Sequence, residues 1–308
     1  MEAQNYFLTV DSGGSKTEII LYDSNGEPVN KGVSKGFGAA VDCDRVLSEL
    51  AKDLSDVCEG KAPSVIVCNL GGKNKEQLER TFYSVFPSSR VRVFRESEGV
   101  IAKELCAKFG AQVNLMVGTG SIAVAPTDSG VVISGGWGAN ISDKGSGYQL
   151  GLDAVRLALG ELDGASELSL LTKALTGIED PPGVTSAEEY CAFRDSVRAS
   201  LFPFDRANLA LKAKTVYKCA KAGDPTALEL YEKMGSDLSG IVLSAMAKTG
   251  EELKCAVVTG GMVNAKEFWQ ESFEKSLKSR YADFTALYIP DGLSIGLLEI
   301  AKRMFEGE

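Results

Sequence analysis

The chain of 308 residues contains no histidine. This absence excludes catalytic sites of the Ser-His-Asp or Cys-His type, zinc sites with histidine ligands and pH switches based on histidine. A general base that works near neutral pH is therefore expected to be a carboxylate, or less often a lysine or a cysteine.

Long apolar runs and closely spaced cysteines are also missing. No apolar run approaches the length of a membrane span, and the N-terminal segment MEAQNYFLTV lacks the pattern of a secretion signal. The seven cysteines are never closer than ten residues, so no Cys-x-x-Cys motif is present. We therefore expect reduced thiols in a cytoplasmic protein.

Positive charge is in deficit, with 33 basic against 42 acidic residues and a net charge of −9. This balance argues against a dedicated surface for nucleic acid or for an anionic membrane. The chain length predicts about two domains, and an apolar content of 44% is sufficient for a core in each.

Apolar periodicity in the N-terminal third predicts strands that alternate with helices, which is typical of an α/β layer structure. The expected strands are Tyr6–Val10, Glu18–Tyr22, Ser64–Asn69 and Arg90–Phe94, and the expected helices are Asp42–Glu59, Lys75–Val85 and Gly99–Phe109.

The strand pattern starts again at Val113. Strand, Gly/Ser turn, strand, Asp-Ser turn and strand follow one another as they do in residues 9–29, and aligning Ser15 with Ser121 places Gly14 on Gly120. A match this short can arise by chance, but a true repeat predicts two similar half-structures that each open with a glycine hairpin. The expected strands here are Val113–Val117, Ile122–Ala125 and Val131–Ser134.

Helical spacing dominates after residue 145. The predicted helices are Ser146–Leu162, Glu167–Thr176, Ser186–Ala199, Ala207–Ala222 and Pro225–Thr249. The chain then continues with a strand Cys255–Thr259, a helix that ends near residue 279, a strand Leu287–Ile289 and a final helix Ser294–Phe305.

Two glycine turns are candidates for phosphate binding. The first is Asp11-Ser-Gly-Gly-Ser-Lys-Thr17, in which backbone N–H groups can surround an anion, Lys16 can add charge and Asp11 can hold Mg²⁺. The second is Gly118-Thr-Gly-Ser-Ile-Ala123, which fails as a dinucleotide motif because a strand follows it where that motif requires a helix. An ordinary glycine hairpin is the alternative for the first.

In three further segments, glycine or acidic residues lie at the end of an expected strand or just before an expected helix. Asp143, between Gly135-Gly-Trp-Gly138 and a long helix, is either a ligand of a substrate hydroxyl or an N-cap. Gly260 and Gly261 form either a strand-to-helix turn or a backbone surface for a base or ribose. Glu96 and Glu98 follow a strand and are either ligand-facing carboxylates or a solvated first helical turn.

Together and in this order, these motifs resemble the actin, hexokinase and heat-shock-chaperone ATPase superfamily. Within it, the resemblance is to the branch that contains N-acetylglucosamine kinases, glucosamine kinases and the ATPase subunits of benzoyl-CoA reductase. Ala220-Lys-Ala-Gly-Asp-Pro-Thr-Ala227 is similar to this branch as well. The resemblance extends from residue 9 to about residue 300.

The resemblance implies an α/β fold of two ribonuclease-H-like domains, with a cleft between them that closes on ATP and Mg²⁺. The expected domains are 1–112 plus 292–308, and 113–291 with a helical insertion. The implied cofactor-binding residues are Gly13, Gly14, Ser15, Lys16, Thr17, Gly118, Thr119, Gly120, Ser121, Gly260 and Gly261. Asp11 is implied near the metal, and Gly136, Trp137 and Asp143 are implied as sugar-binding residues.

The chain departs from the sugar kinases at three places. Glu96, preceded by Arg95, stands where those enzymes have an aspartate base, and we assign it as the catalytic base. Their asparagine near the early glycine-rich loop is missing from Gly32–Ala39, and their Pro-x-x-Gly-Ala motif is replaced by Asp291–Gly296. These changes leave ATP binding better supported than the choice of sugar.

The leading functional hypothesis is an ATP-dependent kinase of a sugar or amino-sugar hydroxyl, which acts on a small-molecule substrate and forms a homodimer. One alternative is an ATPase that activates a partner enzyme, although the cysteines show no cluster-binding motif. A second alternative is an ATP-binding regulator with weakened catalysis.

Overall fold

The structure, a computed structural model, describes residues 5–12, 16–36, 43–70, 75–95 and 98–307. The chain forms two compact units, Met1–Gly110 with Asp291–Glu308, and Ala111–Pro290. Each unit is built on a five-stranded sheet, with the order β3-β2-β1-β4-β5 in the first and β8-β7-β6-β9-β10 in the second. In both sheets an antiparallel three-stranded meander is followed by two parallel strands. The predicted α/β class and the predicted repeat are therefore confirmed.

The first sheet brings the carboxyl ends of three strands to one edge, because β1, β4 and β5 are parallel. Asp11 near the end of β1 is beside Asn69 of β4, and Glu18 of β2 is opposite Asp11 on the other side. The strands are β1 (Tyr6–Ser12), β2 (Lys16–Asp23), β3 (Pro28–Lys35), β4 (Val65–Leu70) and β5 (Arg90–Arg95).

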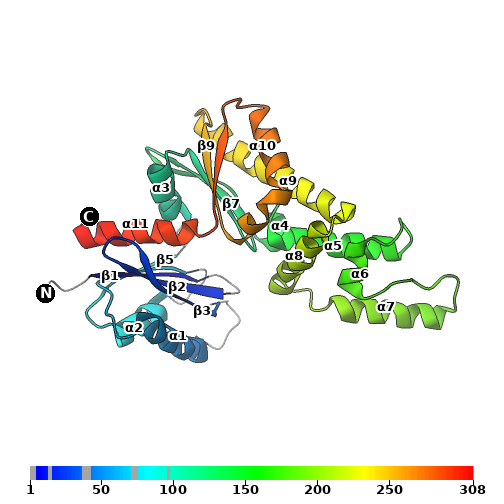
Figure 1. Cartoon of the computed structure of the whole chain (residues 1–308), viewed down its shortest axis with the longest axis horizontal. Coiled ribbons are helices and arrows are strands. Elements are labelled where there is room, and N and C mark those ends of the chain that lie inside the picture. The colour runs from blue at the N-terminus through cyan, green and yellow to red at the C-terminus, as the bar shows by residue number, and fades with distance from the viewer. Residues whose placement is uncertain (1–4, 13–15, 37–42, 71–74, 96–97, 308) are drawn as a thin grey trace. The chain divides into compact units, whose positions relative to one another are not determined.

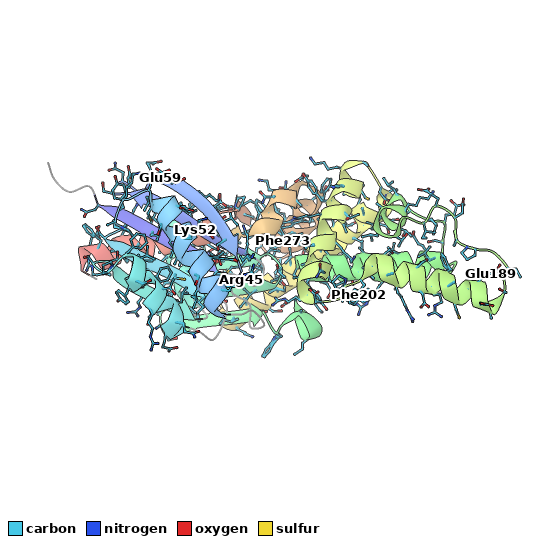
Figure 2. The ribbon with its side chains drawn as sticks, turned by 90° about the horizontal axis from the view of Figure 1, so that it is seen from below. Arg45, Lys52, Glu59, Glu189, Phe202 and Phe273 are labelled. Atoms are coloured by element: carbon cyan, nitrogen blue, oxygen red, sulfur yellow. The ribbon has the colours of Figure 1, made fainter. Side chains whose placement is uncertain are left out.

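Helices cover both faces of the first sheet (Figure 1). On one face, α1 (Cys43–Cys58) and α2 (Lys75–Val85) bury apolar side chains at helical spacing, those of α1 being Val46, Leu50, Leu54 and Val57. Polar residues spaced by seven stand on the outer side of α1 and just beyond its end, namely Arg45, Lys52 and Glu59 (Figure 2). On the other face, α11 (Gly292–Glu306) packs Phe305 on Phe7 with the ring centroids 5.6 Å apart, and it also contacts α3 (Glu98–Phe109).

The second unit repeats this plan with a larger helical part. Its strands are β6 (Val113–Val117), β7 (Ser121–Thr127), β8 (Gly130–Gly135), β9 (Cys255–Thr259) and β10 (Thr285–Ile289). Between β8 and β9 the chain forms α4 (Ala139–Ser142), α5 (Gly147–Leu162), α6 (Leu170–Thr176), α7 (Ala187–Leu201), α8 (Arg206–Lys221) and α9 (Pro225–Thr249). A 3₁₀ segment, η1 (Gly261–Phe268), and α10 (Gln270–Lys278) separate β9 from β10.

The core of the second unit lies where α9 and α10 pack against the sheet, and its largest fully buried side chain is that of Trp269. A separate apolar cluster joins α5, α7 and α8 through residues such as Val155, Leu201 and Leu209. None of the helices that the structure describes is both long enough and apolar enough for a membrane span.

Three differences from the expected elements go beyond one or two residues at the end of an element. The helix expected from Glu167 begins at Leu170, because the Ser169 hydroxyl caps it by accepting from the Thr172 N–H. The helix expected after Gly261 is divided at Trp269 into η1 and α10. The short helix α4 has no counterpart among the expected elements.

Candidate functional site

The glycine turn of the second unit joins β6 to β7, which pair up to Val117 opposite Ser121. Gly118 N–H donates to the Gly120 carbonyl across the turn at 2.8 Å. The carbonyls of Gly118 and Thr119 accept from the first N–H groups of α5, those of Gly147 and Tyr148, at 2.9 and 3.2 Å. The start of α5 therefore holds the carbonyl side of the turn.

This arrangement leaves two donors of the turn available. The N–H groups of Thr119 and Gly120 have no hydrogen-bond partner among the residues that the structure describes. Neighbouring N–H groups in a tight turn form a concave site for an anion such as phosphate. The geometry of residues 118–121 thus fits their expected role as a phosphate-binding turn.

Two hydrogen bonds connect the segment from Gly136 to Gly145 to the same turn. Gly136 N–H donates to the Ser121 carbonyl at 2.9 Å, and the Ser121 hydroxyl donates to the Lys144 carbonyl at 2.6 Å. Gly136 has φ +71°, and a Cβ there would lie 2.8 Å from Ile122 Cδ1. Glycine is therefore required at this position, because a side chain would be strained and would also meet β7.

Trp137 and Asp143, both in this segment, differ sharply in exposure. Trp137 is 73% exposed, whereas Asp143 is only 1% exposed. Asp143 does not cap the long helix, since the N-cap of α5 is Ser146, whose hydroxyl accepts from Gln149 N–H at 3.1 Å. The capping alternative for Asp143 is therefore wrong.

The carboxylate of Asp143 is engaged by Arg206, the first residue of α8. Arg206 Nη2 donates to Asp143 Oδ2 at 2.9 Å. The same nitrogen would lie 2.7 Å from a Cβ on Gly120, and Asp143 Oδ2 would lie 3.1 Å from it. Asp143, Arg206 and Gly120 thus form one cluster at the turn of residues 118–121.

Gly260 follows β9 at the edge of the sheet that also carries the turn. It has φ +99°, and a Cβ on it would lie 2.5 Å from the Val117 carbonyl oxygen. No side chain fits there, because the backbone of β9 passes directly against the end of β6. A Cβ on Gly261 would meet nothing within 4 Å, so this backbone is open to a flat ligand.

Asp11 and Asn69 form the corresponding pair in the first unit. Asn69 Nδ2 donates to Asp11 Oδ1 at 2.8 Å. Burial raises the pKa of the Asp11 carboxyl above its usual range, which the hydrogen bond from Asn69 opposes and the charge of Glu18 reinforces. A partly buried carboxylate that stands beside an amide fits a divalent cation such as Mg²⁺, which prefers oxygen ligands.

The structure describes only some of the remaining expected residues of the first unit. Thr17 is buried, and its hydroxyl donates to the Lys35 carbonyl at 2.8 Å and lies 2.9 Å from the Ser12 hydroxyl. Lys16 is exposed and lies 3.5 Å from Glu18 Oε1. Gly13, Gly14, Ser15 and the expected base Glu96 lie outside the described residues.

With this geometry in view, comparison with known proteins decides the family. The model of the BadF/BadG/BcrA/BcrD ATPase family matches residues 8–298. The chain belongs to this family.

Curated relatives match the chain along nearly its whole length. It is 22% identical to the N-acetyl-D-glucosamine kinase of Dictyostelium discoideum, over 97% of this chain and 98% of that protein. It is 24% identical to the N-acetylmuramic acid/N-acetylglucosamine kinase of Clostridium acetobutylicum, over 96% of this chain and 98% of that protein. Among solved structures it resembles a ROK family glucokinase from Streptomyces griseus in complex with glucose and AMPPNP. The TM-score is 0.64, and the sequences are 14% identical over 97% of this chain and 100% of that chain. The likeness in structure confirms the fold.

Sequence reasoning missed Asn69 and Arg206. Asn69 had an available signal, because it ends an expected strand of the α/β pattern, and the structure pairs that strand in parallel with β1, which carries Asp11. Arg206 had no such signal, because 63 positions separate it from Asp143. The apolar periodicity of the helix that it begins indicates only which face of that helix is buried.

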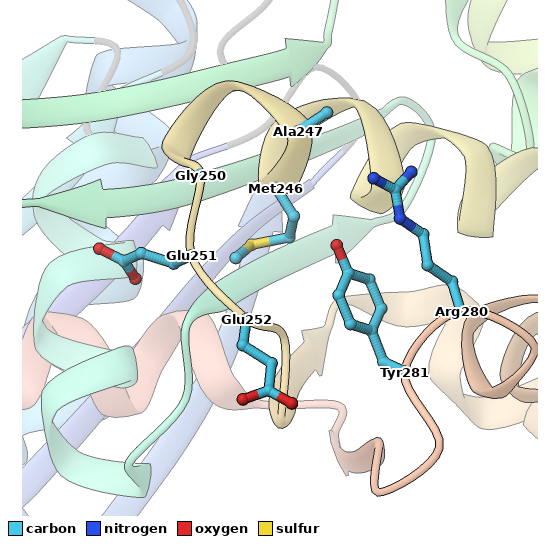
Figure 3. A pocket seen from close by; sticks show the side chains of 7 residues that line it. All are labelled: Met246, Ala247, Gly250, Glu251, Glu252, Arg280 and Tyr281. Atoms are coloured by element: carbon cyan, nitrogen blue, oxygen red, sulfur yellow. The ribbon is translucent and has the colours of Figure 1, made fainter.

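A hollow of about 370 Å³ lies elsewhere in the second unit (Figure 3). It is formed between the end of α9 at Gly250 and the end of α10 at Arg280 and Tyr281. These residues precede β9 and β10, so the hollow lies at the edge of the sheet opposite to Gly260. It is therefore separate from the turn of residues 118–121.

Proposed function

We propose that the chain is an ATP-dependent kinase that phosphorylates a hydroxyl of a small sugar, with amino sugars such as N-acetylglucosamine or glucosamine as the leading substrates. The observation that carries this proposal is the phosphate turn with two available N–H donors, to which Trp137 and the buried Asp143 are attached through the segment after Gly136. Curated relatives that match over the full length are sugar kinases, which supports the same reaction.

In this proposal, the N–H groups of Thr119 and Gly120 bind phosphate oxygens of ATP, and the open backbone at Gly261 lies against the adenosine. Trp137 offers an apolar face to the sugar ring, and Asp143 accepts a hydrogen bond from a sugar hydroxyl. Asp11 holds Mg²⁺, with Asn69 fixing the orientation of its carboxylate; when bound, Mg²⁺ neutralises charge on the phosphates.

Catalysis then consists mainly of positioning and of electrostatic stabilisation. The sugar hydroxyl oxygen forms a bond to the γ-phosphorus while the bond to the β–γ bridging oxygen breaks, and ADP leaves with that electron pair. The hydroxyl proton passes to a carboxylate, for which we propose Glu96. A homodimer is proposed as the assembly, and sedimentation of the purified chain tests it.

The proposal is tested by ADP release from ATP across a panel of N-acetylglucosamine, glucosamine, muramic acid derivatives and hexoses, with a reaction lacking sugar as the control. We expect at least one amino sugar to stimulate ADP release, with a sugar phosphate detected by mass spectrometry. ADP release that no sugar changes would overturn the kinase assignment. Bound iron with visible absorption after purification without oxygen would favour the partner-activating ATPase instead.

A further inference from the structure

Arg206 stands over the phosphate turn of the second unit although it belongs to the helical part of that unit. Asp205 caps α8, and Arg206 begins the helix. Its Nη2 atom contacts Asp143 at 2.9 Å and occupies the space beside Gly120 that a Cβ would need. The guanidinium therefore lies directly against the turn that joins β6 to β7.

The two partners of this ion pair are exposed to very different degrees. The Asp143 side chain is almost fully buried, whereas that of Arg206 is 53% exposed. A guanidinium has five N–H donors in a fixed fork, and Asp143 is the only hydrogen-bond partner that Arg206 has among the described residues. Asp143 thus anchors one arm of the fork, and the other donors of this half-exposed side chain have no partner among the described residues.

The phosphate turn lacks a cation of its own. Gly118-Thr-Gly-Ser121 offers backbone donors and hydroxyls, whereas the equivalent turn of the first unit contains Lys16. A planar guanidinium matches the oxygens of a phosphoryl group in shape and in charge. Arg206 supplies the missing positive charge from a position 86 residues away in the sequence from Gly120.

We propose that Arg206 binds the phosphoryl group that is transferred, and that Asp143 holds its guanidinium over Gly120 in addition to contacting the sugar. The inference rests on the proposed function, because ATP is the phosphoryl donor. As the bond to the bridging oxygen of ADP breaks and the bond to the sugar oxygen forms, negative charge spreads over the three peripheral oxygens of the phosphoryl group. Arg206 stabilises this charge, and the sugar proton still goes to Glu96.

The proposal also explains why position 120 is glycine. Its φ is not in the left-handed region, so the backbone conformation alone does not require glycine. A methyl group there would meet Arg206 Nη2 at 2.7 Å and would displace the guanidinium from the turn. Gly120→Ala is therefore expected to weaken catalysis by moving Arg206 while leaving the arginine in the chain.

The test compares Arg206→Gln, Arg206→Lys and Arg206→Ala with Arg198→Gln. Arg198 is a matched control, because it is an exposed arginine of the same helical part and is paired with Asp195 at 3.7 Å, on α7. We expect Arg206→Gln to lower kcat by about 10²–10³-fold, the effect of removing one donor that acts on transition-state charge. Arg206→Lys recovers part of the loss, and Arg198→Gln stays within about threefold of wild type.

Nucleotide affinity distinguishes a direct contact between Arg206 and the phosphoryl group from a purely structural role of this arginine. Removing Arg206 leaves Asp143 buried without its partner, which can loosen the fold. If Arg206 contacts the terminal phosphoryl group, Arg206→Gln weakens binding of the ATP analogue AMPPNP by roughly tenfold or more and leaves ADP affinity unchanged. Equal weakening of both nucleotides, or no weakening of either, would overturn the proposal.

Rescue by a free cation provides a second discriminating readout. Adding guanidinium ion at millimolar concentration should raise kcat of Arg206→Ala and should leave Arg198→Gln unchanged. Absence of rescue in Arg206→Ala would count against direct contact. If no sugar is turned over by the wild type, the proposed function fails. The comparison of AMPPNP with ADP still decides whether Arg206 contacts the terminal phosphoryl group.

Discussion

Asp11 and Glu18 are direct neighbours across β1 and β2, and their surroundings shift their carboxyl pKa values in opposite directions. The pKa of Asp11 is raised, chiefly by burial. Burial also acts to raise the pKa of Glu18, but the hydrogen bond from Lys31 at 3.1 Å and the charge of Lys16 outweigh it and lower the pKa. The hydrogen bonds and charges around Glu18 thus outweigh its burial, whereas those that Asn69 and Lys16 provide at Asp11 do not.

This difference predicts that neutralising Asp11 and neutralising Glu18 change the thermal stability in opposite directions. A raised folded pKa makes the ionised Asp11 destabilising above that pKa, and the penalty disappears as the pH falls below the ordinary value of 3.8. Without metal, Asp11→Asn should therefore raise Tm at pH 7, by about 2–4 °C if the gain is near 1 kcal/mol. The gain should shrink as the pH is lowered, and thermal unfolding at several pH values measures it.

Glu18→Gln is the matched comparison at the neighbouring position. Because the folded pKa of Glu18 is lowered, its ionised form stabilises the fold above the ordinary value of 4.5, and this contribution is lost as the pH falls through the folded pKa. The variant should lose Tm at pH 7, and its difference from wild type should close in acid. A gain in Tm at pH 7 would contradict the assigned surroundings.

Magnesium should control nucleotide affinity. Beside the proposed contact of Arg206, the turn of residues 118–121 offers mainly backbone donors, so the charge of ATP still requires Mg²⁺, for which Asp11 is the proposed ligand. Calorimetric titration should show much weaker ATP binding in EDTA than in Mg²⁺. Asp11→Asn should remove most of the gain that Mg²⁺ brings, and equal affinity of the wild type under both conditions would exclude this role.

Glu96 should carry the proton transfer. Glu96→Gln is expected to lower kcat by roughly 10²–10⁴-fold with ATP affinity nearly unchanged, the range typical of general-base catalysis. Glu98, the first residue of α3, provides the control, and Glu98→Gln should keep kcat near the wild-type value. Asp143→Asn should raise the sugar KM and, through Arg206, also lower kcat. Near-normal kcat in Glu96→Gln would make Asp143 the first candidate for the base.

Trp137 should report sugar binding by fluorescence. The chain has two tryptophans, of which Trp269 is fully buried and Trp137 is 73% exposed. A bound sugar that covers Trp137 should shift the emission to shorter wavelength, while the emission of Trp269 provides a constant background. Trp137→Phe should abolish the change. A wild-type spectrum that ignores every sugar that is turned over would place Trp137 outside the sugar site.

Comparing Gly260→Ala with Gly261→Ala distinguishes an effect on backbone packing from an effect on nucleotide binding. A Cβ at Gly260 would lie 2.5 Å from the Val117 carbonyl, at a φ of +99°, so the first variant should lose at least about 1–3 kcal/mol of stability. The second should fold normally, because nothing lies within 4 Å, and should weaken ATP binding if adenosine lies there. Urea unfolding and calorimetry measure the two effects. Equal stability loss in both variants would contradict the close approach at Gly260.

Local sequence signals determined most of the elements of this protein. Lys75–Val85, Val113–Val117, Pro225–Thr249 and Cys255–Thr259 have the bounds that the sequence predicts. The reason is visible at α9, where Asp224 caps the helix, Pro225 occupies its first position and Gly250 ends it in the left-handed conformation. Each of these signals acts within a few residues of the position it controls. The order of the glycine motifs likewise predicted the repeated hairpin.

The tertiary structure decided which side chains meet. Asn69 reaches Asp11 because two strands are parallel neighbours, and Arg206 reaches Asp143 because α8 begins beside the turn of residues 118–121. Of the two roles that the sequence left open for Asp143, the tertiary structure excludes the helix cap, because Ser146 caps α5 and the Asp143 carboxylate pairs with Arg206, 63 residues away. Contacts of this kind leave no periodicity in the sequence, since they depend on how separate elements pack together.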